Sequence, residues 1–521
     1  MVKKFFVCYV FLFVSFLSLA KVVTAESDDN KYESENEICE KCNCTDINKE
    51  NETKEIFTID CSMKTLENTF SEWPKDLDDS YKEIIYIMSF NTINKLSQFP
   101  STDATIFFTC KNCKLSEIAV NAFIDVKNIV SIDLSFNEIT GDSLHPDIFR
   151  GPHSDTDNSP INLQMLDLSH NDISYLDEKL FEHTPNLKKI VLSHNQLKNI
   201  ADGTLQALSS CQYLEILHLE HTGISDLPSE LFQNMKHLSE IILNDNQFLE
   251  VPASLSIIGS SLEDLQFNKN PIEVINSQSF NGLEKLQKLS INFMDNLKSI
   301  EKKSFHNLNM LEVLHCSENK KLTDMDLEDL LNLINLKDLD LSNNQLKTLS
   351  FGELIEIEKT ENSTEVREYF KKLHNLKLSG NPWHCDCSMI KALEFFNHNS
   401  TYFNKAKKSD DSDARCKSPT EMSSKLLYIL PFDFVCASDY KSKPLKIPVY
   451  DPPQFLRPKS IMLTVVSIVI VLVLGVIIGI LIVCVSRRLK SNNDITSNPI
   501  RYSAVRNSTI SNAVNVPYQQ P

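Results

Sequence analysis

Apolar residues recur through the middle of the chain with the pattern L-x-x-L-x-L-x-x-N-x-L-x-x-L. Four segments fit it directly: 163–176 (LQMLDLSHNDISYL), 187–200 (LKKIVLSHNQLKNI), 262–275 (LEDLQFNKNPIEVI) and 336–349 (LKDLDLSNNQLKTL). The Asn position, which we call the ladder position, recurs mostly every 22 to 27 residues. It is occupied in turn by Asn91, Cys113, Asn137, Asn171, Asn195, Thr222, Asn246, Asn270, Met294, Asn319, Asn344 and Asn381. A period of this length predicts a solenoid of stacked coils.

Each part of the pattern has a physical reason. The L-x-L core predicts a short strand whose alternate side chains point into the solenoid. Neighbouring coils stack these strands in parallel, because one coil cannot bury its apolar face alone. We expect the ladder Asn to turn its amide inward and to satisfy backbone groups at a bend. Coils with Thr222 or Met294 at that position are expected to be looser. A recurring Phe is expected in the core on the convex side: Phe123, Phe181, Phe232, Phe280 and Phe305.

Two steps of the repeat are longer than the others, and they contain residues 141–160 and 350–370. The first segment is rich in Pro, Asp and Ser, which predicts an irregular excursion. The second is charged and partly helical by pattern. Surface insertions are well tolerated, so each segment is either a specificity loop or an inert excursion.

The two ends of the chain predict a membrane topology. Residues 1–25 join Lys3 to a long apolar run and end in small residues, as a secretory signal peptide does; an uncleaved anchor is the alternative. Residues 461–485 carry no charge and are long enough to cross the hydrocarbon core, and Arg487 follows on the side expected to be cytoplasmic. The sequence therefore predicts a single-pass type I protein of the plasma membrane with its N-terminus outside.

Charge narrows the classes of partner. The chain holds 52 Lys and Arg against 70 Asp and Glu, a net charge of −18, and residues 26–460 alone hold 44 against 69. Such a surface repels nucleic acid and favours a basic or neutral partner. Only 10 glycines are present, which argues against glycine-rich phosphate loops. Four sequons in the part expected outside are candidate glycan acceptors: Asn43, Asn51, Asn362 and Asn399.

Cysteine motifs flank the repeats. The first is Cys39-x2-Cys42-x-Cys44 with Cys61 following, and the second is NPWHCDC at 381–387, followed by Cys416 and Cys436. With the repeats between them, these motifs resemble the extracellular leucine-rich-repeat family with cysteine-rich caps at both ends, which includes Toll-like receptors. The resemblance covers residues 39–436. It implies the disulfides Cys39–Cys44, Cys42–Cys61, Cys385–Cys416 and Cys387–Cys436, which spacing alone does not select.

The resemblance and the repeat together predict an α/β leucine-rich-repeat solenoid, with a curved parallel sheet on the concave face, disulfide caps and one transmembrane helix. The expected organisation is a signal peptide (1–25), an acidic N-terminal segment (26–38), an N-terminal cap (39–80), leucine-rich repeats (81–380), a C-terminal cap (381–436), a juxtamembrane linker (437–460), the membrane span (461–485) and a cytoplasmic tail (486–521).

Two residue clusters suggest chemistry. Cys110 and Cys113 form C-x-x-C, a redox or zinc spacing, but both fall at inward positions, so buried inert thiols are expected there and at Cys211 and Cys316. His170, His194 and His221 precede the ladder position on successive strands, an arrangement that suits a metal or a pH sensor or is simple family filler. No catalytic constellation can be assembled from the repeats. We expect no enzyme activity, no catalytic or metal residues and no cofactor.

Protein binding is the function that this scaffold serves best, because a rigid curved sheet presents outward side chains at little entropic cost. The sequence predicts a cell-surface receptor or adhesion molecule whose partner is an extracellular or cell-surface protein, a second copy of this chain included. An accessory receptor in innate recognition is the alternative; the tail is too short for the Toll-like receptor signalling domain. The expected ligand-binding residues are Asp167, His194, His218, Glu220, His221, Glu240, Asp245 and Asp264, with Val191, Ile216 and Ile242 as apolar anchors.

Within the predicted span and tail, a glycine motif and two tyrosines suggest further roles. Gly475 and Gly479 form G-x-x-x-G, a spacing that favours close packing of two helices and hence a dimer, although the motif also occurs in spans that do not dimerise. Tyr502 and Tyr518 are candidate phosphorylation sites in a polar tail.

Overall fold

The computed structural model describes residues 37–49, 53–75, 77, 80–153, 158–325, 330, 332–349, 372–387, 389, 392–393, 414–427 and 430. All of them lie in the first of two compact units, 1–441 and 442–521. The predicted signal peptide, linker, membrane span and tail fall outside the described residues. Within the described part, no helix has the length and apolarity that crossing a membrane requires.

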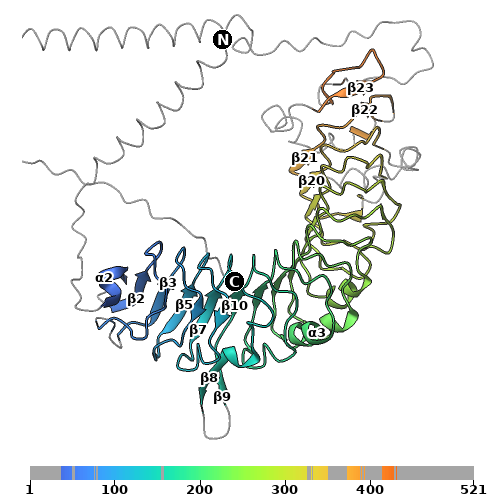
Figure 1. Ribbon diagram of the computed structural model, residues 1–521. Coiled ribbons are helices and arrows are strands. Elements are labelled where there is room, and N and C mark those ends of the chain that lie inside the picture. Colours follow the sequence, from blue (N-terminus) through green and yellow to red (C-terminus); the bar gives the residue numbers. More distant parts are fainter. Residues whose placement is uncertain are drawn as a thin grey trace, which may run out of the picture. The chain divides into compact units, whose positions relative to one another are not determined.

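A 14-stranded sheet lines the inner side of the described coils (Figure 1). The first two strands pair antiparallel, and every later neighbour pairs in parallel, as the repeat predicts. The strands follow in the spatial order β1 (Asn43–Lys49), β2 (Thr53–Asp60), β3 (Glu83–Ile87), β5 (Thr105–Thr109), β7 (Ile129–Asp133), β10 (Met165–Asp167), β11 (Lys189–Val191), β12 (Ile216–His218), β13 (Glu240–Ile242), β14 (Asp264–Gln266), β16 (Lys288–Ser290), β18 (Val313–His315), β20 (Asp338–Asp340) and β21 (Asn375–Lys377).

Short elements connect these strands on the other sides of each coil. The small strands are β4 (Lys95–Leu96), β6 (Glu117–Ile118), β8 (Arg150–His153), β9 (Asn158–Pro160), β15 (Val274–Ile275), β17 (Ser299–Ile300), β19 (Asp324–Met325), β22 (Trp383–His384) and β23 (Cys416–Ser418). The helices are α2 (Glu37–Lys41) and α3 (Asp202–Ser209), with 3-10 turns η1 (Pro146–Phe149), η2 (Ser229–Phe232) and η3 (Ala253–Ile258). Most of the described convex side is therefore turn and 3-10 helix. The structure is a β-solenoid with few helical residues, rather than the α/β solenoid that the sequence predicted.

The ladder is formed as predicted. The twelve ladder residues are all buried. Asn195 is typical: its Nδ2 donates to the carbonyl oxygens of Leu168 and Leu192, each at 2.9 Å, and its Oδ1 accepts from the backbone N–H of Ile173 at 2.9 Å. Each amide thus joins two coils and closes the bend after its own strand. Thr222 keeps part of this role, since its hydroxyl donates to the carbonyl of Leu219 at 2.8 Å. The five recurring Phe residues are buried in the core, as predicted.

Disulfides close the caps. Cys39–Cys44, Cys42–Cys61 and Cys385–Cys416 are formed, in the pairing that the family resemblance implied. Cys387 is also disulfide-bonded, and its expected partner Cys436 lies outside the described residues. In the C-terminal cap the indole of Trp383 is fully buried and donates to the carbonyl of Leu378 at 2.7 Å. These contacts cover the apolar ends that an open stack of coils would expose.

The prediction of four free buried thiols was wrong for one pair. Cys110 and Cys113 are both fully buried, but they form a disulfide with their Cα atoms 5.8 Å apart. Cys110 and Cys113 occupy the positions that Leu134 and Asn137 occupy in the next coil. There, the ladder amide of Asn137 donates to the carbonyl of Leu134 at 2.9 Å, so these two positions lie in contact across the turn. Cys211 and Cys316 are free and buried, and burial raises the pKa of each thiol to about 12.

The segment 141–160 is more ordered than its composition predicted. It contains η1 and then the antiparallel pair β8–β9, which projects away from the sheet side of the coil in Figure 1. Leu144, Ile148 and Phe149 are buried, and the Phe149 ring stacks on Phe123 with centroids 6.1 Å apart. Three apolar side chains that reach the core therefore hold the segment, and the Pro and Asp residues obscured them. The other long segment, 350–370, lies outside the described residues.

Candidate protein-binding face

A single backbone feature shapes the edge of the concave face. The residue immediately before each ladder position has a positive φ, between 53° and 72°. These residues, which we call the left-handed column, are Phe90, Asn112, Phe136, His170, His194, His221, Asp245, Lys269, Phe293, Glu318, Asn343 and Gly380. Non-glycine residues with positive φ are uncommon, and Asn, Asp and His are the types that tolerate it best. Six of the twelve residues are His, Asp or Asn, while three Phe, Lys269 and Glu318 adopt the same conformation despite their larger side chains.

Four members of this column form a stack of rings, which we call the ring stack. Phe136 lies 3.9 Å from His170, His170 lies 3.9 Å from His194, and His194 lies 4.7 Å from His221, measured between ring centroids. The rings are nearly parallel, with interplanar angles of 13°, 11° and 26°. Strand spacing places one such ring per coil, so the repeat itself produces the stack.

Charged groups close both ends of the ring stack. The Lys111 ammonium lies over Phe136, 4.7 Å from the ring centroid, a cation–π contact. At the other end, His221 Nδ1 lies 3.0 Å from Asp245 Oδ2. Burial lowers the pKa of His170 and of His194, and in each case the next histidine of the stack lowers it further. The two inner imidazoles are therefore held neutral at pH 7.

Ion pairs link neighbouring strands next to the ring stack, from β12 to β16. His218 Nε2 lies 2.9 Å from Glu240 Oε1, and Lys288 Nζ lies 3.3 Å from Asp264 Oδ2. Burial raises the pKa of Asp264 despite its lysine neighbour. Further along, His315 lies 3.7 Å from Asp338, whose bond raises the pKa of His315, while His315 in turn lowers the pKa of Asp338. The pKa of His315 is thus shifted in the opposite direction from the pKa values of His170 and His194 on the same face.

A second amide ladder runs along the sheet, which the sequence interpretation missed. Asn244 Oδ1 accepts from the backbone N–H of Asn268 at 2.8 Å, Asn268 Oδ1 accepts from the N–H of Asn292 at 2.7 Å, and Asn292 Oδ1 accepts from the N–H of Ser317 at 2.7 Å. The signal was present: these residues lie two positions before successive ladder residues. They fix the surface of β13 to β18.

Two polar atoms interrupt this order. Ser193 is 2% exposed, and its Oγ has no hydrogen-bond partner among the residues that the structure describes; the same holds for the buried Glu220 Oε2. The two residues occupy the same position on adjacent coils, since β11 and β12 pair with Val191 opposite His218. In other coils the equivalent Ser bonds an Asp two residues earlier, as Ser169 does with Asp167 at 2.6 Å. Val191 removes that acceptor from Ser193.

The structure brings the eight predicted ligand-binding residues onto one continuous surface across β10 to β14. Asp167, His218, Glu240 and Asp264 lie on the strands, and Glu220 follows β12. His194, His221 and Asp245 belong to the left-handed column. Of the predicted apolar anchors, Ile216 and Ile242 are half-exposed, but Val191 is only 8% exposed and offers little surface.

The arrangement does not suit a metal ion. Within the described ranges, no three His, Cys, Asp or Glu side chains converge as ligands. The reason is geometric, because imidazoles stacked face to face hold their ring nitrogens in parallel planes and do not aim them at one point. Of the two chemical roles considered for the three histidines, only proton uptake fits the stacked geometry.

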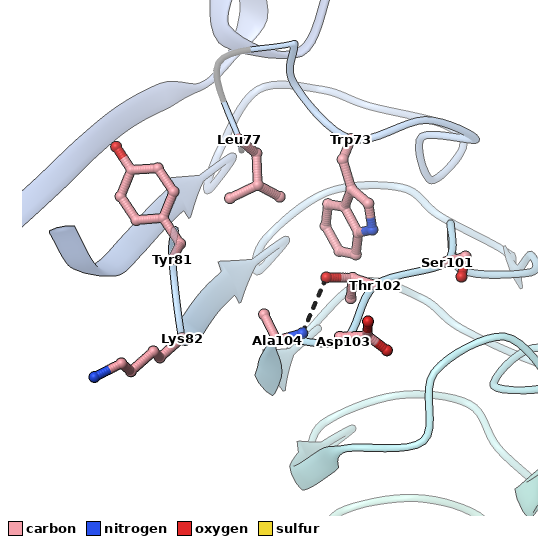
Figure 2. Close-up of a pocket in the computed structure, with 8 residues that line it drawn as sticks. All are labelled: Trp73, Leu77, Tyr81, Lys82, Ser101, Thr102, Asp103 and Ala104. Carbon is pink, nitrogen blue, oxygen red and sulfur yellow. Dashed lines mark hydrogen bonds between the residues drawn. The ribbon is translucent and has the colours of Figure 1, made fainter. Parts of the chain in front are cut away.

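A hollow near the N-terminal cap differs from the concave face in that its polar groups bond to the chain itself. It measures about 660 Å³ and lies where β3 and β5 begin, between Trp73 and Leu77 on one side and residues 101–104 on the other (Figure 2). The Trp73 indole donates to the carbonyl of Pro100 at 3.0 Å, and the Ala104 N–H donates to Thr102 Oγ1 at 3.2 Å. Its polar groups thus bind the chain itself, and Lys82 and Asp103 are its charged lining.

Comparison with known proteins agrees with this architecture. Residues 161–216 match the family model described as leucine rich repeat, and residues 258–377 match the BspA type leucine rich repeat region, in 6 copies. Nephrocan of Mus musculus is 27% identical over 201 residues, which cover 34% of this chain and 34% of Nephrocan. The chain thus matches about a third of the length of that relative. The coils in these two ranges match leucine-rich-repeat models.

Two solved structures were also matched, each at low overall similarity. A chain from the octameric complex of Latrophilin 3, Unc5D and FLRT2 superposes with a TM-score of 0.38 and 18% identity, over 74% of this chain and 97% of that chain. Human 5T4, also named Wnt-activated inhibitory factor 1 or trophoblast glycoprotein, superposes with a TM-score of 0.35 and 19% identity, over 48% of this chain and 86% of that chain.

Proposed function

We propose that this chain is a cell-surface receptor or adhesion molecule that binds a protein ligand through the concave face of its leucine-rich repeats. The observation that carries the proposal is the continuous outward surface of β10 to β16, whose parallel register is fixed strand by strand. Buried ladder amides hold the backbone beneath it. A surface that is ordered before binding loses little entropy when a partner docks.

A protein partner suits this face better than a small molecule. The hollow along the left-handed column, lined by Asp245, Lys269 and Phe293, measures about 360 Å³ and is open, whereas small-molecule sites enclose their ligand. Exposed aromatic side chains are typical of protein interfaces. Phe293 is 47% exposed although its backbone conformation disfavours a bulky residue, so backbone preference does not explain this side chain.

We further infer a single-pass type I topology, with residues 461–485 in the membrane and the repeats outside. The formed disulfides support an oxidising compartment. Asn43, the described sequon, is exposed on β1 and is accessible to a glycan. Removal of N-glycans from surface-labelled full-length protein should increase its gel mobility, whereas protein that is neither labelled nor glycosylated contradicts the topology.

The function is tested by cell mixing. Full-length protein is displayed on non-adherent cells, and labelled expressing cells are combined with unlabelled expressing or non-expressing cells at neutral pH. Clusters confined to expressing cells show that the partner is a second copy of the chain. If surface expression is confirmed and no clusters form, homophilic adhesion fails, and the displayed protein is screened against cells that carry other surface proteins.

A matched pair of variants tests the binding face. Ile216→Arg with Ile242→Arg places two charges between β12 and β13 at half-exposed positions, where a docked partner is expected to be excluded. Ile334→Arg places a charge at a residue that is 50% exposed on a turn outside the sheet. Loss of clustering, or of heterologous binding, is expected only for the first variant. Equal behaviour of the two variants at equal expression would remove the concave face from the proposal.

A further inference from the structure

The centre of the concave face concentrates groups that change charge near physiological pH. The outward positions of the coils from β7 to β16 carry six carboxylates, three lysines and four histidines, a net charge of −3 with neutral imidazoles and +1 with all four protonated. The carboxylates are Asp133, Asp167, Glu220, Glu240, Asp245 and Asp264; the lysines are Lys189, Lys269 and Lys288; the histidines are His170, His194, His218 and His221. Proton uptake therefore inverts the sign of this surface.

One carboxylate at this centre lacks a donor. Glu220 Oε2 is buried without a hydrogen bond, while Glu240 is bonded by His218, Asp245 by His221 and Asp264 by Lys288. Ser193, at the same position of the preceding coil, is 98% buried, and its Oγ likewise has no partner among the described residues. A buried carboxylate oxygen gains most from a charged donor, because no water hydrogen bond is lost in exchange. An ammonium or guanidinium group supplies that donor.

Resting on the function proposed above, we propose that the Ser193–Glu220 position and the ring stack form a proton-controlled docking site for a Lys- or Arg-bearing segment of the protein partner. At neutral pH the segment's cation bonds the partly exposed Glu220. The rest of the segment lies against the outward edges of the His194 and His221 rings, which accept the methylene stem of a Lys or Arg side chain. The acidic balance of the surrounding strands adds attraction over a longer range.

Acidification releases the segment by two linked effects. The charged imidazoles repel the incoming cation, and they repel each other across 3.9 Å and 4.7 Å, which opens the stack. Because burial and the neighbouring histidines lower the pKa of His170 and of His194, these two rings take up protons below the ordinary histidine range. The charged and titratable groups that face it from the adjoining coils are Lys111, Asp133, Glu138, Asp167, Asp172, His218, Glu220, Asp245 and Lys269.

The test uses purified full-length chain immobilised on a biosensor at physiological salt. The probe is a twelve-residue peptide of alternating Lys and Gly, and the comparison probe has Glu in place of Lys. The Lys probe is expected to bind at pH 7.4 at least tenfold more tightly than at pH 5.0, and the Glu probe is expected not to bind at pH 7.4. Glu220→Gln should weaken Lys-probe binding at pH 7.4 about tenfold, because the amide keeps the shape and removes the charge.

Matched variants separate this site from general acidity. Glu284→Gln removes the same charge at an exposed residue on a convex turn and should leave binding unchanged. The triple variant His170→Gln, His194→Gln, His221→Gln cannot charge, so it should keep its pH 7.4 affinity at pH 5.0. Equal losses in Glu220→Gln and Glu284→Gln, or an unchanged pH response in the triple variant, would overturn the proposal.

The outcome is independent of the cell-mixing result. Clusters that persist unchanged at pH 5.0 would overturn the proton-controlled site and leave the proposed adhesion standing. Absence of clusters at every pH, with Lys-probe binding that depends on Glu220 and on the three histidines, would remove homophilic adhesion and leave the site in place for a heterologous partner.

Discussion

Two columns of side chains run side by side through the coils, and they differ in how much the fold restricts them. The ladder positions are buried and almost uniform in chemistry, with nine Asn among twelve residues. The left-handed column, one residue earlier in every coil, is mostly exposed and holds Phe, His, Asp, Lys, Glu, Asn and Gly. The backbone conformation repeats along both columns. Burial, rather than backbone geometry, is therefore what fixes residue identity, and the exposed column is where one member of this architecture can differ from another.

The largest effect expected from this comparison is in two adjacent residues. Asn195→Ala leaves the carbonyl of Leu192 and the N–H of Ile173 without partners and removes one of the two donors to the carbonyl of Leu168, and it should lower the free energy of unfolding by about 3 kcal/mol. His194→Ala removes an exposed ring and should cost less than about 1 kcal/mol. Denaturant unfolding of the purified full-length chain measures both. Similar losses would mean that the exposed column is as structural as the ladder.

A smaller loss of stability is expected at the coil that has Cys113, rather than Asn, at its ladder position. Cys110→Ala with Cys113→Ala removes a short disulfide-closed loop and should cost about 2 kcal/mol in loop entropy, with a cavity adding to it. Cys110→Leu with Cys113→Asn restores the pattern of the other coils and should recover most of that loss. Denaturation midpoints of the two double variants decide the matter. If the Leu/Asn variant is the less stable one, the disulfide does more than substitute for the amide.

Acidity should separate the two kinds of histidine on the face. The pKa values of His170 and His194 are lowered from the ordinary 6.5, so the unfolded chain takes up their protons first. Their contribution to stability is complete above pH 6.5 and declines as pH falls below it. His315 has a raised pKa, so its contribution is complete below pH 6.5 and is lost as pH rises through the folded value.

Proton NMR titration of the histidine ring hydrogens should place the midpoints of His170 and His194 below that of His315. The signal lost in His315→Gln is assigned to His315, and the signal lost in His194→Gln is assigned to His194. A single midpoint shared by all three would contradict the environments that the structure gives them.

Burial also explains what the sequence predicts and what it leaves open. The strands, the ladder and the core Phe residues recur because each must fit an inward position, so a periodic pattern reports them directly. The C-x-x-C pair was misjudged although both positions were correctly placed inward, because the pattern gives register and not the contact of Cys110 with Cys113 across the turn. The 141–160 segment was misjudged because Phe149 enters the core from outside the repeat period.

The candidate site was predictable only in outline. Register placed Asp167, His218 and Glu240 on one face, since strand alternation is regular. The unpartnered hydroxyl of Ser193 could not be foreseen, because it results from Val191 occupying a position where Asp accepts from the equivalent Ser in other coils. The unpartnered oxygen of Glu220 depends on its side-chain rotamer. The amide ladder from Asn244 to Asn292 was visible as a repeat but not as a bonded chain. Side-chain bonds between coils depend on rotamers, which a sequence pattern does not contain.

The smallest effect sharpens the comparison at Phe293. This residue is 47% exposed in a left-handed conformation, where a bulky side chain is strained and Asn is tolerated. Phe293→Asn should therefore raise the free energy of unfolding by about 0.5–1 kcal/mol, measured by denaturant unfolding of the full-length chain. Phe293→Ala is the control, because it removes the same ring without the tolerance of Asn. A gain for Asn and none for Ala would show that the chain keeps Phe293 at a cost in stability, as expected of a side chain retained for binding. Equal values would assign the position to packing alone.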